Sequence, residues 1–314
     1  MIFRNTFRLL FSNFSNVWKV LVYYCICIIL TFCVCGALAY PIIVKLSDAK
    51  VFESFAEAVN GIFASSPELT ATRFQNVTDT AWSILSGSRH LFANYIIVSI
   101  WMLVVFPFTL DLAQLPMGEV LYGYMTSQTK YGFTGRFIKT IGKSAEYSVI
   151  RLLVTLPFNI ASIAIVYFMI KLATFGNPLF LVLDILLLSL LFVVLTLKYS
   201  LLSCWMPAIS VLDLNVFEAL SLNFRCIKRR FASIFSTGLL LVLIAFVFNL
   251  IFGVFSFTVS FVVSLPLTAF VFVIFQMVSF FSAQGMRFYV YPDLFISPKT
   301  FEESLSVDNT KYII

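Results

Sequence analysis

The chain has 314 residues, of which 61% are hydrophobic and only 11% are charged, whereas a soluble globular domain carries roughly 25% charged residues. Its 37 phenylalanines are a larger apolar load than a soluble chain of this length can bury. Composition therefore excludes an ordinary soluble domain, and the formal charge of +6 needs an explanation other than solubility.

Six long apolar runs follow one another along the chain. Each is close to or above the roughly 20 residues that a helix needs to cross a bilayer. Inside hydrocarbon every backbone polar group must bond within its own segment, so these runs are predicted to be helices. We expect one all-α membrane domain over residues 1–314, with transmembrane helices at about 18–44, 93–115, 149–171, 179–206, 233–256 and 258–282.

The first two spans are separated by the longest segment outside the apolar runs, residues 46–92. Apolar residues recur at helical spacing over 48–62, and Pro67 suits the first turn of a second helix that runs out at Gly87. A segment of this size is too small for a core of its own. It is predicted to be an extracytoplasmic helical cap inserted in the first hairpin.

Basic residues divide unequally between the two sides of this topology. Sixteen of the 21 Lys and Arg residues fall on one side, the side of both termini, and five on the other. The positive-inside rule then puts both termini in the cytoplasm, including a tail at 283–314. The basic excess is interpreted as contact with anionic lipid headgroups, and nucleic acid is not expected as a partner. The five residues expected outside are Lys45, Lys50, Arg73, Arg89 and Lys171.

Each odd-numbered span is preceded by a basic, amphipathic segment on the predicted inner side. Spans three and five also share a triplet, Phe158-Asn159-Ile160 and Phe248-Asn249-Leu250. These features predict three copies of one unit, each an inner amphipathic helix followed by a transmembrane hairpin. Chance similarity is the alternative, because the identities are few.

Ionisable residues within membrane spans are candidates for function because they are costly there. Asp111 and Lys198 lie at corresponding places near the inner ends of spans two and four, and Arg287 follows span six. They are predicted to form an inner-boundary charge cluster, with structural pairing favoured over a proton or ion relay. Arg151 and Asp184, near the starts of their spans, are predicted to be interfacial anchors.

Three amides lie deeper in the predicted spans: Asn159, Asn249 and Gln276. Midplane amides commonly hydrogen-bond between helices. The alternative is a polar path at the centre of the bundle, which would suit a transporter.

A third group of candidates lies in the inner basic segments, which are expected to contact lipid headgroups or a protein partner. A lipid-facing charged surface is favoured, and a docking site for a cytoplasmic partner is the alternative. These candidates are Arg136, Lys139, Lys143, Arg225, Lys228, Arg229 and Arg230.

Sequence motifs of enzymes are missing. The single histidine, His90, lies on the predicted outer side, and the chain has no His-Glu-x-x-His, no Gly-x-Ser-x-Gly and no glycine-rich phosphate loop. We therefore expect no catalytic residues, no metal and no cofactor.

The segment Pro207, Asp213, Glu218-Ala219-Leu220 and Lys228-Arg229-Arg230-Phe231, followed by a hairpin, resembles uncharacterised six-helix bacterial integral membrane proteins. That group is related to the membrane domain of some glycerophosphodiester phosphodiesterases. Leu115-Pro116-Met117-Gly118 adds to the resemblance, which covers roughly 95–295 in layout. It implies a bacterial plasma membrane, and the phosphodiesterase activity is not carried over, because no such catalytic domain follows.

Together these features predict a non-enzymatic multi-pass membrane protein that organises or assists partners or lipids at the cytoplasmic face. The alternative is a transporter or permease subunit with a polar path at the bundle centre. A polar cavity that reaches the midplane amides would favour transport, and a bundle packed by Phe and Leu would favour the structural role.

Overall fold

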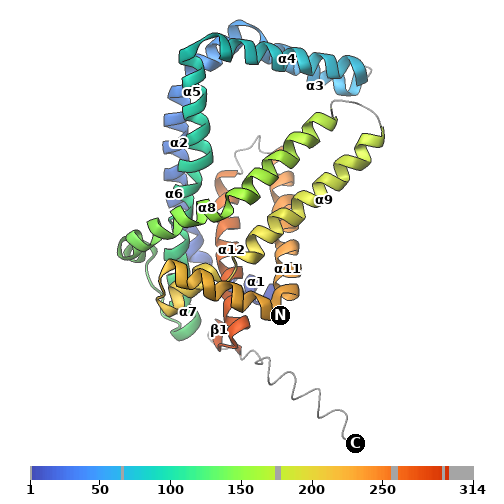
Figure 1. The fold of residues 1–314 in the computed structure, drawn as a ribbon. Coiled ribbons are helices and arrows are strands. Elements are labelled where there is room, and N and C mark those ends of the chain that lie inside the picture. The colour runs from blue at the N-terminus through green and yellow to red at the C-terminus, as the bar shows by residue number, and fades with distance from the viewer. Residues whose placement is uncertain (1, 65–66, 174–177, 256–260, 292–293, 297–314) are drawn as a thin grey trace, which may run out of the picture. The chain divides into compact units, whose positions relative to one another are not determined.

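The computed structural model describes residues 2–64, 67–173, 178–255, 261–291 and 294–296. Over these residues the fold is helical apart from one small β-hairpin (Figure 1). Its elements are α1 (Ile2–Ser12), α2 (Phe14–Asp48), α3 (Val51–Ala64), α4 (Pro67–Gly87), α5 (Arg89–Ile100), the π-helical turn η1 (Trp101–Val105), α6 (Phe106–Asp111), α7 (Gln114–Ser127), α8 (Phe133–Ala173), α9 (Pro178–Leu201), α10 (Trp205–Leu212), α11 (Val216–Phe255), α12 (Phe261–Gln284), β1 (Phe288–Tyr291) and β2 (Leu294–Ile296).

Six helical stretches are long and apolar enough to cross a membrane, as predicted. The second of them contains the π-helical turn, which ends two residues before Pro107. Proline lacks a backbone N–H and its ring crowds the preceding turn, so the helix is free to widen there. The second span then ends at Asp111 and the fourth at Leu201, both earlier than the apolar runs suggested.

The inner amphipathic segments of the third and fifth spans are not separate helices. Helix α8 runs unbroken through the boundary expected at residue 149, and α11 continues across a kink at Arg230, where φ is −139°. In α8 a buried stripe continues across that boundary at helical spacing, through Tyr147, Arg151 and Thr155. Nothing in this stretch interrupts the helix before Pro157.

The chain separates into two compact units that divide several helices between them. Unit 1 comprises Met1–Ile26, Phe108–Thr155 and Leu195–Ile314, and unit 2 comprises Cys27–Pro107 and Leu156–Val194. The core of unit 1 is built on α12, which packs against α1, α7, α10 and α11. In α12, 61% of the most apolar stretch is buried, against 28% or less in the other spans, so α12 is the central helix. Its fully buried side chains include Phe270, Phe275, Phe280 and Phe281.

In unit 1 the second, fourth and sixth spans each end at a short break that is followed by another element: α7, α10 and the β1–β2 hairpin, respectively. Side chains from other helices bond to the backbone at the first two breaks. Tyr23 donates a hydrogen bond of 2.6 Å to the carbonyl of Thr109, at the end of α6. Asn223 donates to the carbonyl of Leu201 at 2.8 Å and accepts from the N–H of Cys204 at 2.9 Å. These bonds satisfy backbone groups that a helix end leaves open.

The β-hairpin was not predicted. Phe288 pairs with Ile296 and Tyr289 with Phe295 in an antiparallel ladder, and the first strand packs on α1 and α7. Phe288 and Val290 are fully buried there, so the hairpin belongs to the core of unit 1. The remainder of the expected tail, 297–314, lies outside the described residues.

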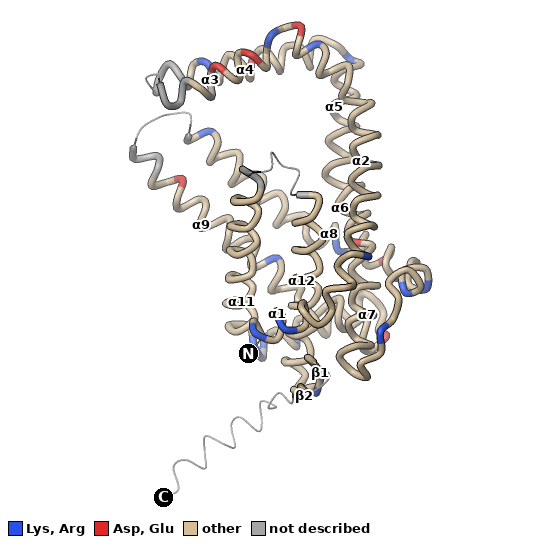
Figure 2. The backbone as a smooth tube through the Cα atoms, turned by 180° about the vertical axis from the view of Figure 1, so that it is seen from behind, with Lys and Arg blue, Asp and Glu red and all other residues tan. Residues whose placement is uncertain are grey.

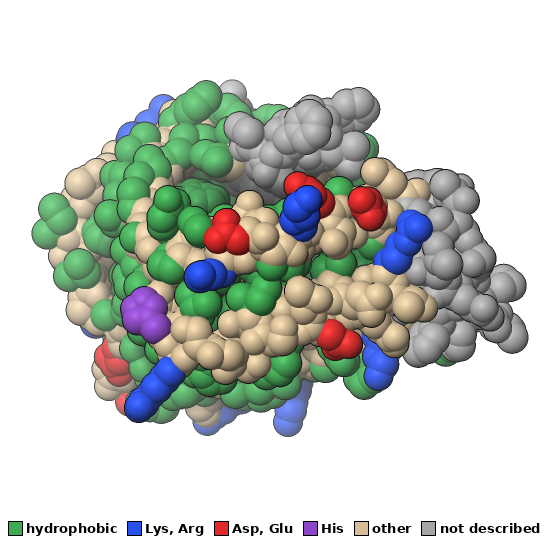
Figure 3. Space-filling view, turned by 90° about the horizontal axis from the view of Figure 1, so that it is seen from above, with side chains coloured by type: hydrophobic (Ala, Val, Ile, Leu, Met, Phe, Trp, Pro, Cys, Tyr) green, Lys and Arg blue, Asp and Glu red, His purple; other side chains and the backbone are tan. Residues whose placement is uncertain are grey.

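Unit 2 contains the two helices expected in the segment 46–92, α3 and α4, which pack against each other. Phe55 and Phe74 meet edge-on between them, with ring centroids 5.9 Å apart. Charged side chains of both signs lie along the face that Figure 3 shows. Within the same unit Asn94 of α5 donates a hydrogen bond of 3.2 Å to the carbonyl of Leu38 in α2.

Candidate functional site

A polar cavity of about 530 Å³ lies in unit 1, between α7, the start of α8 and the end of α10. Helix α7 contributes Glu119, Tyr122, Gly123 and Thr126, and α8 contributes Arg136, Lys139, Thr140 and Lys143. Both sets follow the spacing i, i+3, i+4, i+7, which places four side chains on one face of a helix. The remaining wall is Tyr131, Ser210, Val211 and Asp213.

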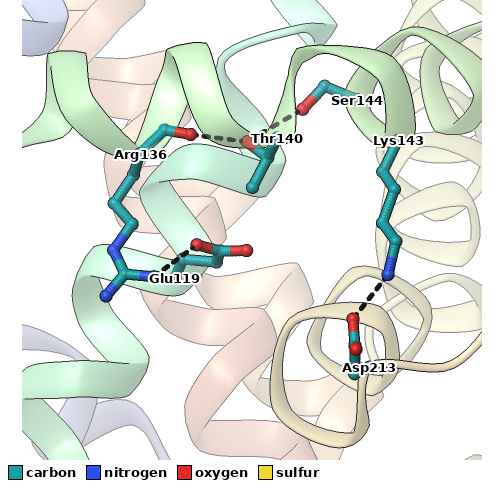
Figure 4. A network of polar contacts seen from close by, with 6 residues as sticks. All are labelled: Glu119, Arg136, Thr140, Lys143, Ser144 and Asp213. Atoms are coloured by element: carbon teal, nitrogen blue, oxygen red, sulfur yellow. Dashed lines mark hydrogen bonds and ion pairs between the residues drawn. The ribbon is translucent and has the colours of Figure 1, made fainter.

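Two ion pairs hold basic side chains of α8 at the cavity wall (Figure 4). Arg136 donates to Glu119 of α7 at 3.1 Å, and its guanidinium lies 3.9 Å from the centre of the Tyr131 ring. Lys143 donates to Asp213, which follows α10 and has a left-handed backbone with φ 54°. The two pairs fix α8 to α7 and to the end of α10.

Lys139 lies between Arg136 and Lys143 on the same face of α8. It is exposed, and the described part of the chain holds no ion pair that includes it. Its charge also acts on Asp213, less strongly than that of Lys143. The hydrogen bond from Lys143, the charge of Lys143 and that of Lys139 together hold the pKa of Asp213 below its ordinary value of 3.8. Asp213 is therefore a carboxylate at neutral pH.

Two glycines of α7 shape the cavity. A Cβ at Gly123 would overlap the Tyr131 ring, which is the ring that stacks on Arg136. A Cβ at Gly118 would overlap the sulfur of Met206 and would lie 2.8 Å from Oγ of Ser210, both on α10. The close approach of α7 to α10, and of Tyr131 to α7, therefore depends on the absence of side chains at these positions.

The predicted inner-boundary cluster has a different membership in the structure. Asp111 is paired with Arg151, at 2.6 Å, and accepts a second hydrogen bond of 2.6 Å from Gln114. Lys198 is close enough to interact electrostatically with Asp111 but does not form the direct pair. The interpretation of Arg151 as an interfacial anchor is wrong: it is buried, because α8 begins 18 residues earlier and carries Arg151 into the packed part of unit 1.

The other two ionisable candidates lie apart from this pair. Arg287 is exposed in the segment before β1, and no ion pair among the described residues joins it to Asp111. Asp184, on α9, is half-buried in unit 2.

The three midplane amides do not line the polar cavity. Asn249 of α11 accepts a hydrogen bond of 2.5 Å from Ser264 of α12, an interhelical bond of the favoured kind. Gln276 is buried in α12, and its Oε1 has no hydrogen-bond partner in the part of the chain that the structure describes. Asn159 is half-buried on α8 and belongs to unit 2.

The remaining basic candidates are on α11. Arg225 and Lys228 are exposed, whereas Arg230 donates a hydrogen bond of 2.8 Å to Ser282 of α12 at the kink. The side chain of Arg229 lies outside the described residues.

Sequence reasoning named Arg136, Lys139 and Lys143 as inner-face contacts, and it predicted neither the cavity that they line nor its wall on α7. The i, i+3, i+7 spacing of Arg136, Lys139 and Lys143 recurs in Glu119, Tyr122 and Thr126. This periodicity in the sequence is the signal that indicates a second polar helix face. The site offers cations, hydroxyl groups and two carboxylates around an open space, which suits binding of a charged polar group.

Comparison with models of protein families, with curated proteins and with solved structures found no match.

Proposed function

We propose that this chain is a non-enzymatic multi-pass protein of a bacterial plasma membrane that organises anionic lipids at its cytoplasmic face, with both termini in the cytoplasm. The observation that carries the proposal is the segregation of basic side chains. All sixteen Lys and Arg residues expected inside belong to unit 1, and all five expected outside belong to unit 2. The two units are defined by contacts alone, so the structure separates these residues without reference to their charge, and the positive-inside rule then favours a cytoplasmic unit 1.

The distribution of acidic residues strengthens this support. Unit 2 has six Asp and Glu residues against its five Lys and Arg, whereas unit 1 has nine against sixteen. Figure 2 shows basic positions in α1 and at the start of α8, whereas α3 and α4 carry both signs. Exposed cations such as Arg225 and Lys228 would lie at anionic headgroups, each contributing about 1 kcal/mol.

The three-hairpin arrangement is part of the same proposal. The second, fourth and sixth spans each end in a break and a further packed element in unit 1, which is what three copies of one unit would produce. The relation to six-helix bacterial membrane proteins rests on the same layout.

A transporter or permease subunit is the second candidate. Gln276 favours it, because it places in the central helix an amide oxygen that has no hydrogen-bond partner among the described residues. The phenylalanine packing around α12 favours the first candidate, as does a cavity lining that includes none of Asn159, Asn249 and Gln276.

The lipids that accompany the protein test the proposal. Extraction from the membrane with a nanodisc-forming polymer, followed by lipid analysis, should show more phosphatidylglycerol around the protein than in the bulk membrane. The double variant Arg225→Gln/Lys228→Gln should lose part of that enrichment.

A matched control removes two charges from unit 2, in Lys45→Gln/Lys50→Gln, and should leave the enrichment unchanged. Absence of enrichment around the wild-type protein, or equal loss in both double variants, would contradict the proposal. Reporter domains fused to the N-terminus and inserted at residues 65–66 test the orientation separately, and the two are expected on opposite sides of the membrane.

A further inference from the structure

We propose that the cavity between α7, α8 and α10 binds the phosphodiester group of one anionic phospholipid, with Lys139 as its main cationic contact. This inference rests on the proposed function, since it names the ligand of one site on the same face. The cavity is lined by other residues than Arg225 and Lys228, so the cavity site and the proposed function can fail separately.

The size and lining of the cavity fit a headgroup. Small-molecule sites have volumes of about 300–1,000 Å³, and this one has about 530 Å³. Four residues with hydroxyl groups, Tyr122, Thr126, Thr140 and Ser210, line its wall. Thr126, Thr140 and Ser210 donate their hydroxyl protons to carbonyls of their own helices. The Tyr122 hydroxyl can donate a hydrogen bond to a phosphate oxygen, and lysine is a common phosphate-binding residue.

The charge of the wall selects the kind of phosphate. Three cations face two carboxylates, so the excess is one positive charge. Arg136 and Lys143 each have a carboxylate partner, which leaves Lys139 as the lining cation without an ion pair in the described chain. A phosphodiester has one negative charge and matches this excess. A phosphomonoester or a nucleotide has more, and Glu119 and Asp213 would repel the additional charge.

The surface of α8 next to the cavity indicates a lipid rather than a free phosphate. Ile138, Ile141, Val149 and Leu153 are exposed, at 69%, 50%, 49% and 67%. At 100° per residue they form one apolar stripe. This stripe runs along α8 in the direction of the membrane span, and Lys139 lies between it and the other cavity residues of the helix. Acyl chains along the stripe would bring their headgroup to Lys139.

A binding titration in non-ionic detergent tests this assignment with the full-length protein. Dihexanoylphosphatidylglycerol should bind saturably, and Lys139→Gln should weaken it about fivefold, the effect of one interfacial cation worth about 1 kcal/mol. Lys45→Gln removes an exposed charge of unit 2 and should leave the affinity unchanged. Glycerophosphoglycerol, which lacks acyl chains, and inorganic phosphate should bind at least tenfold more weakly.

A second pair of variants tests the space itself. Thr126→Trp fills the cavity from α7 and should abolish saturable binding, whereas Ser127→Trp, on the next residue, should not. Equal effects of Lys139→Gln and Lys45→Gln would overturn the site. Binding of the free headgroup as tight as that of the lipid would overturn the lipid assignment. Phosphatidylglycerol enrichment that depends on Arg225 and Lys228 but not on Lys139 would refute the cavity alone.

Discussion

Two ion pairs of unit 1, one between Arg151 and Asp111 and one between Lys143 and Asp213, have similar lengths but differ in burial. Arg151 and Asp111 lie 2.6 Å apart with side chains 8% and 18% exposed. Lys143 and Asp213 lie 2.5 Å apart with side chains 47% and 90% exposed. The first pair lies in the packed part of unit 1, and the second forms the rim of the polar cavity.

The difference separates structural charges from charges available to a ligand. Breaking a buried pair leaves an uncompensated charge in a low-dielectric region, which is strongly destabilising. An exposed pair contributes little because water and salt screen it. We therefore expect substitutions at the first pair to change folding and substitutions around the cavity to change binding.

The largest effect is expected for Arg151→Gln. It leaves Asp111 with only Gln114 as a direct partner, and the free energy of unfolding should fall by about 3–5 kcal/mol. Size-exclusion chromatography after heating in detergent measures the loss of folded protein. The double variant Asp111→Asn/Arg151→Gln should recover much of it, since both members of the buried ion pair are then neutral. A double variant as unstable as the single one would show that the pair is not the cause.

A smaller effect is expected for Asn223→Ala, which removes both hydrogen bonds to the break between α9 and α10. Two buried backbone groups would lose their partners, and the free energy of unfolding should fall by about 1–3 kcal/mol. Ser221→Ala, at an exposed position of the same helix, is the control for the same heating assay. An Asn223 variant as stable as this control would mean that the break is satisfied in another way.

Glu119→Gln should change binding rather than stability. Arg136 would lose its carboxylate, the excess charge of the cavity would rise by one, and the affinity for dihexanoylphosphatidylglycerol should increase about fivefold. A binding titration with dihexanoylphosphatidylglycerol measures this affinity. Glu146→Gln, at an exposed α8 residue outside the cavity lining, should leave the affinity unchanged. A weaker affinity of the Glu119 variant would show that this carboxylate helps to hold the ligand.

The smallest effect on stability is expected for Asp213→Asn. The folded protein lowers the pKa of Asp213, so its contribution is present above the ordinary value of 3.8 and is lost as pH falls through the lowered pKa. Because the carboxylate is exposed, melting temperatures of variant and wild type should agree within error at pH 7, and any difference should shrink as the pH falls from 3.8 through the lowered pKa of Asp213. A loss at pH 7 comparable with that of Arg151→Gln would remove the distinction between the two pairs.

The helical membrane fold could be predicted from the sequence because apolar runs and charge asymmetry are properties of composition along the chain. The cap helices α3 and α4 followed from apolar periodicity and Pro67. The basic wall of the cavity followed from the amphipathic inner segments, in which Arg136, Lys139 and Lys143 share one face.

What could not be predicted depends on which helices meet. Asp111 has several possible cationic partners at similar depth, and the ion pair that the structure shows joins it to Arg151 of α8. The second cavity wall required α7 to approach α10 and Tyr131, which Gly118 and Gly123 permit. The β-hairpin is two short strands of four and three residues, held in place by burial of Phe288 and Val290.

Melting temperature with and without saturating dihexanoylphosphatidylglycerol tests the division between structural and ligand-binding charges most directly, because a ligand stabilises the state that binds it. Without ligand, Lys139→Gln should melt at the wild-type temperature. With ligand, its melting temperature should rise by less than that of the wild type. Arg151→Gln should melt lower without ligand and keep the full ligand-induced rise. The division would be contradicted by a Lys139 variant with an undiminished rise, or by an Arg151 variant that melts at the wild-type temperature.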